Sequence, residues 1–314
     1  MTRRTHILLM DLLLLLVTFF WGATFIIVKS ALREVDVTTF LTLRFATAFV
    51  LMAILFRNRI LPLHAPTIFA GVVLGVFLWA AFAFQTWALT MISATNTALI
   101  TGLSVAIVPI LSFLLLRRPP AALTAIGVLL AFLGLYILTG GAPSRWRFGE
   151  FLVFLCAICV AFHILLTGYY APRHDTLSLA TWQLGTIALI SLVSAGARGT
   201  LTLSLSREVW QAVVLTALFA TVFAFAVQTY AQRITTPTRT ALIFTGEPVF
   251  GTLFAHYYGG EPLLENHLLG GGLIFLGILL SQIRPGMWSK INSLGGRLNG
   301  NGIKRGLPSA PPSL

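Results

Sequence analysis

The chain carries one segment twice, in residues 81–134 and 224–277, at a constant shift of 143 positions and without a gap. The first copy reads AFAFQTWAL where the second reads AFAVQTYAQ, and TNTALI is matched by TRTALI. Of the 54 aligned positions, 17 are identical. A tandem copy of this length indicates a molecule built from two related halves.

Lipid is the solvent that this composition favours. The chain is 57% hydrophobic, its mean hydropathy is +0.90, and 10% of its residues are charged, against about 25% in soluble domains. The apolar stretches are continuous rather than alternating, which favours helices over a β-barrel. We therefore predict an all-α membrane protein with ten transmembrane helices. These are residues 7–28, 37–56, 68–89, 97–116, 121–139, 149–169, 177–195, 209–230, 240–258 and 267–283.

The basic residues predict the orientation. If the N-terminus is cytoplasmic, 14 Lys and Arg residues fall on the cytoplasmic side and six on the outer side. Cytoplasmic loops carry an excess of Lys and Arg, so both termini are expected inside.

The number of spans in each half and the repeat together predict that the second half is inverted in the membrane. Each half holds five spans, an odd number, so the second half enters the membrane from the opposite side. We expect a first repeat in 1–142, a second, inverted repeat in 143–284, and a disordered basic cytoplasmic tail in 285–314. Two inverted halves have two similar conformations, one open to each side, which is the basis of alternating access.

The ordered set of motifs resembles the drug/metabolite transporter superfamily, specifically the ten-span EamA type. It comprises Phe20-Trp21-Gly22, Arg44, Gly246-Glu247-Pro248-Val249-Phe250, Gly260-Glu261-Pro262-Leu263, and a helix with Gly270 and Gly277. Two places depart from the pattern: Arg117-Arg118-Pro119 replaces a Gly-Glu turn, and Ser104-Val105 stands where the second copy has Glu247-Pro248. The resemblance implies a secondary carrier of the bacterial inner membrane that exports amino acids or other small metabolites through a cavity between its halves.

Charged and titratable groups inside the predicted spans are the first candidates for that cavity. Glu247 lies near the middle of the ninth span, where a charge costs about 2.5–3.5 kcal/mol on insertion scales. It is either a protonatable switch or cation clamp, or a hydrogen-bonded residue beside the bend at Pro248. Arg44 either snorkels outward or pairs with Glu247 or an anionic substrate. Gln183 takes the matching place in the seventh span, and His163 is either a helix contact or a proton relay.

Repeat-equivalent amides and aromatic residues complete the expected substrate cavity. Gln85 and Gln228 either bind a zwitterion or bond between helices. Thr101 either faces the cavity or, with Asn96 and Thr97, caps the fourth span. Trp21, Trp79 and Phe82 either line the cavity or pack in the core. The predicted cavity set is Trp21, Arg44, Trp79, Phe82, Gln85, Thr101, His163, Gln183, Gln228 and Glu247.

Several other classes of function find no support. The chain has no phosphate-binding G-x-x-x-x-G-K loop, no H-E-x-x-H and no G-x-S-x-G motif, so neither cofactor, metal nor nucleophile chemistry is expected. The net charge of +12 is spread over loops and tails, which does not predict a nucleic-acid site. Cys156 and Cys159 sit in an apolar span, where packing is expected over redox chemistry. A passive channel and, less favoured, a membrane enzyme remain the alternatives to a carrier of small molecules with possible proton coupling.

Overall fold

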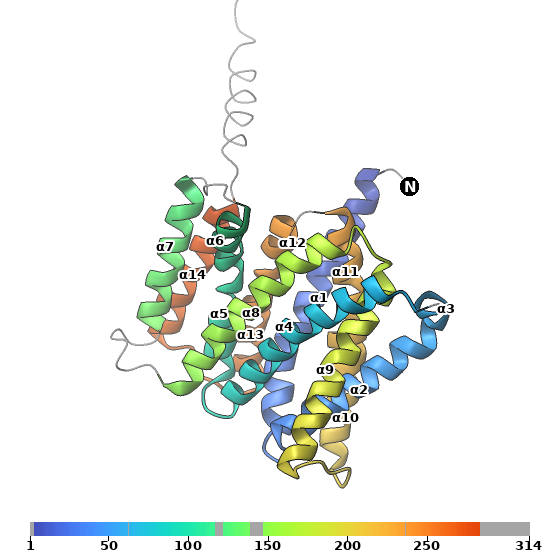
Figure 1. The fold of residues 1–314 in the computed structure, drawn as a ribbon. Helices are drawn as coiled ribbons and strands as arrows, with labels where there is room; N and C mark the ends of the chain where they lie inside the picture. Colours follow the sequence, from blue (N-terminus) through green and yellow to red (C-terminus); the bar gives the residue numbers. More distant parts are fainter. Residues whose placement is uncertain (1–2, 62, 117–121, 139–146, 236, 283–314) are drawn as a thin grey trace, which may run out of the picture. The chain divides into compact units, whose positions relative to one another are not determined.

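A computed structural model describes residues 3–61, 63–116, 122–138, 147–235 and 237–282 (Figure 1). These described residues belong to one compact unit, and they form helices without any strand. The predicted tail at 285–314 and the motif Arg117-Arg118-Pro119 lie outside them.

The helices fall into two successive groups along the chain. The first group is α1 (Arg3–Ala31), α2 (Val37–Leu55), the short α3 (Arg57–Ile60), α4 (Ala65–Leu89), α5 (Ala94–Thr101), α6 (Ser104–Leu116) and α7 (Ala122–Leu138). The second group is α8 (Phe148–Tyr170), α9 (Thr176–Arg198), α10 (Arg207–Ala217), the π-helix η2 (Leu218–Phe223), α11 (Ala224–Ile234), α12 (Pro237–Phe244), α13 (Gly246–Tyr257) and α14 (Glu265–Gln282).

Among the described residues, seven helical stretches are long and apolar enough to cross a membrane. They are Thr5–Ala31, Val37–Leu55, Ala65–Leu89, Ala94–Leu114, Phe148–Tyr170, Thr176–Arg198 and Arg207–Ile234. Each coincides with one of the ten predicted spans. The fifth, ninth and tenth predicted spans correspond to α7, to the pair α12 and α13, and to α14.

Two predicted spans are broken at equivalent places. The fourth is interrupted at Gly102–Leu103, between α5 and α6, and the ninth at Thr245, between α12 and α13. Gly102 and Thr245 are 143 residues apart, so they are repeat mates. Pro248 offers no N–H to the carbonyl of Phe244, where α12 ends, which accounts for the second break. Gly102, a poor helix former, lies at the first.

Small residues let the helices approach closely. A Cβ atom on Gly75 would lie 2.5 Å from Thr186 Cβ, and one on Gly71 would clash with Trp182. Gly71 and Gly75 therefore form a close-packing surface on α4, with α9 as its partner. In the run Gly270-Gly271-Gly272 of α14, by contrast, Gly272 faces nothing within 4 Å.

The contact between α7 and α14 is built from repeat mates. A Cβ atom on Gly134 would lie 2.5 Å from Gly270 O, and one on Gly277 would clash with Gly127 O. Gly127 and Gly134 are the repeat mates of Gly270 and Gly277, which follow 143 positions later in the chain. If each glycine is replaced by its repeat mate, one of these two contacts becomes the other. The two helices run antiparallel, because the later residue of each glycine pair meets the earlier residue of the other.

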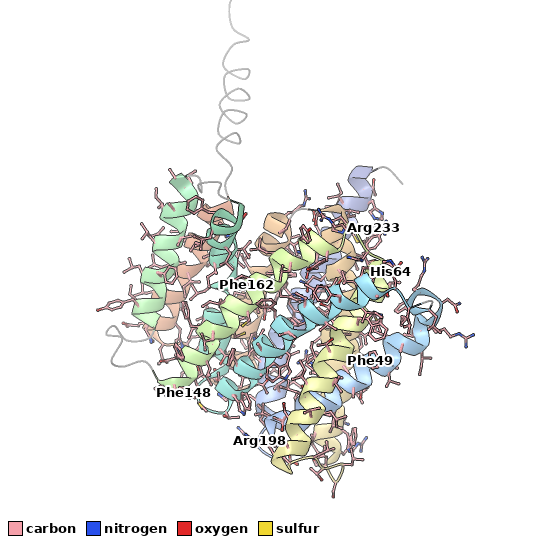
Figure 2. All side chains as sticks on the ribbon, in the orientation of Figure 1. Phe49, His64, Phe148, Phe162, Arg198 and Arg233 are labelled. Carbon is pink, nitrogen blue, oxygen red and sulfur yellow. The ribbon has the colours of Figure 1, made fainter. Side chains whose placement is uncertain are left out.

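Large apolar side chains stay exposed along the helices. Ile54, Phe69, Leu129 and Leu189 are each more than 60% exposed. Figure 2 shows such side chains pointing outward, with Arg233 and His64 towards one end of the helices and Arg198 towards the other. An apolar outer surface with charges at the helix ends is the pattern of a multi-pass membrane protein.

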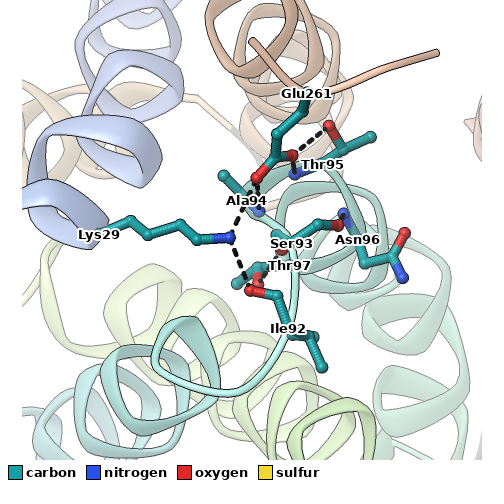
Figure 3. Close-up of polar contacts among 8 residues, drawn as sticks. All are labelled: Lys29, Ile92, Ser93, Ala94, Thr95, Asn96, Thr97 and Glu261. Atoms are coloured by element: carbon teal, nitrogen blue, oxygen red, sulfur yellow. Dashed lines mark hydrogen bonds and ion pairs between the residues drawn. The ribbon is translucent and has the colours of Figure 1, made fainter. Parts of the chain in front are cut away.

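A clasp formed by Glu261 and Lys29 holds the start of α5 (Figure 3). The Glu261 carboxylate accepts hydrogen bonds from Ala94 N at 2.8 Å, Thr95 N at 2.9 Å and the Thr95 hydroxyl at 2.8 Å. Lys29 Nζ, at the end of α1, lies 3.0 Å from Glu261 Oε1 and donates to Ile92 O. A carboxylate suits the positive end of a helix, so the clasp fixes α5, α1 and the loop after α13 together.

Candidate functional site

A cavity lies where α1, α4, α8 and α11 meet the two broken helices. It is lined by Trp21, Thr24, Leu78, Ala81, Phe82, Gln85, Thr101, Gly102, Ser104, Cys156, Val160, His163, Ile164, Phe225, Gln228, Phe244 and Glu247. Its volume is about 630 Å³ when the part open to solvent is included.

Repeat mates line this cavity together. Four pairs of lining residues occupy equivalent positions of the two copies, 143 positions apart in the chain. They are Phe82 and Phe225, Gln85 and Gln228, Thr101 and Phe244, and Ser104 and Glu247. Both halves therefore contribute corresponding positions to one space.

Seven of the ten predicted site residues line the cavity. They are Trp21, Phe82, Gln85, Thr101, His163, Gln228 and Glu247. The structure places Arg44, Trp79 and Gln183 outside the lining, and their role in substrate binding stays a prediction.

Arg44 is pinned to the π-helix rather than to Glu247. Its Nε donates to Thr221 Oγ1 at 2.9 Å, and its Nη2 lies 3.4 Å from Ala220 O. The guanidinium carbon also lies 4.8 Å from the centre of the Phe82 ring. In this π-helix the N–H of Ala224 bonds to Thr221 O, and Ala220 O accepts from Arg44 and from Trp21 Nε1. π-helices often occur at functional sites, and this one holds the cavity wall in place.

Gln183 and Trp79 also lie behind the lining. Gln183 is fully buried on α9 and bonds to His163 on α8, with 2.8 Å between Gln183 Oε1 and His163 Nε2. Trp79 packs in the apolar cluster that contains Phe45 and Leu184. The helix contact expected of His163 is therefore present, and the same ring faces the cavity.

Glu247 enters the cavity at the first turn of α13, directly after the break at Thr245. None of the ion pairs among the described residues includes it. Its repeat mate is Ser104, at the start of α6. The cavity thus carries a carboxylate on one side of the repeat and a hydroxyl on the other.

The two glutamines bond to different neighbours. Gln85 Nε2 donates to Thr101 Oγ1 at 3.2 Å, whereas Gln228 Nε2 donates to Gln232 Oε1 at 3.1 Å. Thr101 is thus at the cavity, and the cap of its helix is Ser93, whose hydroxyl accepts from Asn96 N. The capping role considered for Asn96 and Thr97 falls to Ser93 because α5 starts at Ala94, three residues before the predicted start.

Sequence reasoning missed ten lining residues, and the repeat was an available signal for three of them. Phe225, Phe244 and Ser104 are the repeat mates of the predicted Phe82, Thr101 and Glu247. Cys156 was expected only as a packing residue; it is buried and unbridged, and it borders the cavity. Among the described residues no group of three His, Cys, Asp or Glu side chains is placed to hold a metal ion.

Comparison with known proteins gives one family. The profile described as the EamA-like transporter family matches residues 8–140 and 147–282, once in each half. Two similar proteins of Archaeoglobus fulgidus are each named an uncharacterized transporter. One is 32% identical over 275 residues, covering 87% of this chain and 86% of its own. The other is 27% identical over 296 residues, covering 90% and 99%. A solved structure titled "Crystal structure of protein" matches with a TM-score of 0.67 and 18% identity, over 90% of this chain and 98% of that one.

Proposed function

Because the chain belongs to the EamA-like transporter family, we propose that it is a secondary carrier that exports small organic metabolites across the cytoplasmic membrane by alternating access. Amino acids and molecules of similar size are the substrates that the resemblance implies. Membership of a transporter family indicates translocation rather than catalysis.

The observation that carries the proposal is the cavity lined by repeat mates. A carrier must form two conformations, and two inverted halves around one site supply them. Four mate pairs border the same space, and each half breaks one helix beside it, at Gly102 and at Thr245. Broken helices at equivalent positions are typical of transporter binding sites.

Ten spans and an inverted repeat are part of the proposal. The repeat relates the contact of Gly134 with Gly270 to the contact of Gly277 with Gly127, and the helices that carry them, α7 and α14, are antiparallel. This arrangement supports a two-fold axis perpendicular to the two helices. Other contacts also occur in mate pairs: α4 packs on α8 as α11 packs on α1, and α8 packs on α5 and α6 as α1 packs on α12 and α13.

Counterflow in proteoliposomes tests the carrier against a channel. Vesicles containing the purified full-length chain are loaded with an unlabelled mixture of amino acids and biogenic amines, and uptake of each labelled compound is followed. A carrier takes up its labelled substrate transiently above the equilibrium level, because the internal pool drives exchange. Simple equilibration of a labelled compound, unaffected by the internal pool, would contradict the carrier and favour the channel. Chemical conversion of a compound without translocation would favour a membrane enzyme.

A further inference from the structure

The buried polar atom of the cavity that lacks a partner is a hydrogen-bond acceptor. Gln228 is 1% exposed, and its Oε1 has no hydrogen-bond partner among the described residues. Its Nε2 is already turned towards Gln232, whose own amide donates to Ile164 O. An unpaired buried amide oxygen costs about as much as a lost hydrogen bond, so this atom requires a donor in the cavity.

The hydrogen bond between His163 and the amide of Gln183 leaves the other ring nitrogen of His163 as a second acceptor. Gln183 Oε1 lies 2.8 Å from His163 Nε2. An amide oxygen can only accept, so the proton between these two atoms belongs to His163 Nε2. A neutral imidazole with its proton on Nε2 offers Nδ1 as an acceptor. No side-chain nitrogen that lines the cavity is both buried and unpartnered in the part of the chain that is described.

The charges of the lining side chains also favour a ligand that donates hydrogen bonds. Glu247 is the acidic residue among the lining side chains, and the lining contains neither Lys nor Arg. The guanidinium of Arg44 keeps its charge, because its partners Thr221 and Ala220 O are neutral, but it lies outside the lining with these N–H groups turned away from it. A substrate carboxylate would meet Glu247 and no cation within the lining, which is unfavourable in a desolvated site.

Aromatic rings supply the rest of the surface. The centre of the Trp21 ring lies 4.9 Å from that of Phe244 and 5.8 Å from that of Phe225, which in turn lies 6.2 Å from Phe82. These four rings line the cavity. Aromatic faces attract cations as well as apolar groups, so they suit an apolar body next to a positive charge.

From these contacts, and resting on the proposed carrier function, we infer that the substrate is an organic amine: a protonated ammonium group attached to an apolar body, without a carboxylate. The ammonium donates to Glu247 and Gln228, and the body lies against the aromatic rings. The site therefore selects amines over the free amino acids of the same size.

Three ligands that share one ring separate the possibilities on the unaltered chain. Phenylethylamine carries the ammonium alone, phenylalanine adds a carboxylate, and 3-phenylpropionate has the carboxylate alone. Binding to the purified full-length chain is measured in detergent by isothermal titration calorimetry. We expect phenylethylamine to bind at least about tenfold more tightly than either of the others, since hydrogen bonds to charged groups are the strong ones. Equal or tighter binding of phenylalanine or phenylpropionate, or no binding of the amine, overturns the inference.

A matched pair of variants locates the effect. Glu247→Gln removes the cavity carboxylate, and phenylethylamine binding should fall about tenfold to a hundredfold. Glu208→Gln removes an exposed carboxylate in the first turn of α10, outside the cavity lining, and should leave the affinity unchanged. Equal amine affinity in Glu247→Gln and the unaltered chain, or an equal loss in both variants, contradicts the assignment.

Transport separates this inference from the carrier proposal. The guanidinium analogue of phenylethylamine stays protonated and crosses bare lipid slowly, so it serves for counterflow against protein-free vesicles. Binding of the amine without counterflow would support the amine as the ligand class and contradict the carrier proposal. Counterflow of phenylalanine in preference to the guanidinium analogue would support the carrier and contradict the amine inference.

Discussion

At the scale of single residues, Glu247 combines an ionisable group with a position at the break of a helix. It lines the cavity at the start of α13 and is absent from the ion pairs of the described residues. A carboxylate that binds either a proton or a cationic substrate couples the two, because each occupies the group only when the other has left. We therefore expect any exchange of protons for substrate to depend on this one side chain.

The coupling is tested by replacing Glu247 with Gln. In vesicles with a pH dye inside, external phenylethylguanidinium should make the lumen of wild-type vesicles more alkaline, because protons leave as substrate enters. With Glu247→Gln at saturating substrate, the change should fall to the level of protein-free vesicles. A lumen that becomes as alkaline with the variant as with the wild type would rule out the proton role of Glu247.

The partners of Arg44 could not be predicted from its place in the sequence. A cation inside an apolar span is costly, which placed Arg44 in the predicted cavity. Its partners are Thr221 and Ala220 O. The π-helix that offers this carbonyl has no local sequence signal, so the direction of Arg44 was not predictable from the chain alone. Gln85 and Gln228, by contrast, were found from the repeat, and the same reasoning extends to Phe225 and Ser104.

At the scale of helices, α14 offers a matched test of close packing. A Cβ atom on Gly277 would clash with the backbone of α7 at Gly127, whereas one on Gly272 meets nothing within 4 Å. Gly277→Ala should therefore destabilise the fold by about 1–3 kcal/mol, and Gly272→Ala should be neutral or slightly stabilising. Thermal melting of the purified variants in one detergent measures both. Equal melting temperatures for the two would mean that α7 and α14 do not pack as described.

The clasp at the start of α5 predicts a pH dependence. Burial opposes ionisation of Glu261, but hydrogen bonds from Thr95 N, Ala94 N, Lys29 and the Thr95 hydroxyl outweigh it and lower its pKa below the ordinary 4.5. A group with a lowered folded-state pKa stabilises the fold above its unfolded-state pKa. The contribution of Glu261 should thus be complete above about pH 4.5 and be lost as the pH falls through the folded-state pKa.

Glu261→Gln isolates that contribution. At pH 6 the variant should be less stable by about 1–2 kcal/mol, as for the loss of a helix cap, and its melting temperature should approach that of the wild type towards pH 3.5. Glu34→Gln, which removes an exposed carboxylate outside the clasp, is the control and should melt like the wild type at both pH values. A deficit for Glu261→Gln that persists undiminished at pH 3.5 would show that its charge is not the cause.

Helix positions were largely predictable, and helix interruptions were predictable only in part. Predicted 37–56 became α2 (Val37–Leu55), because Asp36 caps the helix through Thr38 N. The same logic applies to α9, where Asp175 accepts from Ser178 N. Apolar runs measure length but not continuity, so the breaks at Gly102 and Thr245 were drawn as unbroken spans. The bend considered at Pro248 marks the second break, since a proline leaves a carbonyl unpaired four residues earlier.

At the scale of the whole molecule, the proposed inversion places equivalent loops on opposite faces of the membrane. Asp36 and Asp175 begin the second helix of each half, so the loops at 32–36 and 171–175 correspond. With both termini inside, the first loop is expected outside and the second in the cytoplasm. Repeats of the same orientation would put both on one face.

The test uses single cysteines at Arg33 and at Arg173, two exposed residues in these loops, in a chain whose Cys156 and Cys159 are replaced by Ala. A membrane-impermeant maleimide should label Arg33→Cys in intact cells and Arg173→Cys only after the cells are opened. Inverted vesicles should reverse the pattern, so each variant is the control of the other. If both cysteines react from the same side, the halves are not inverted, and alternating access by exchange of their conformations loses its physical basis.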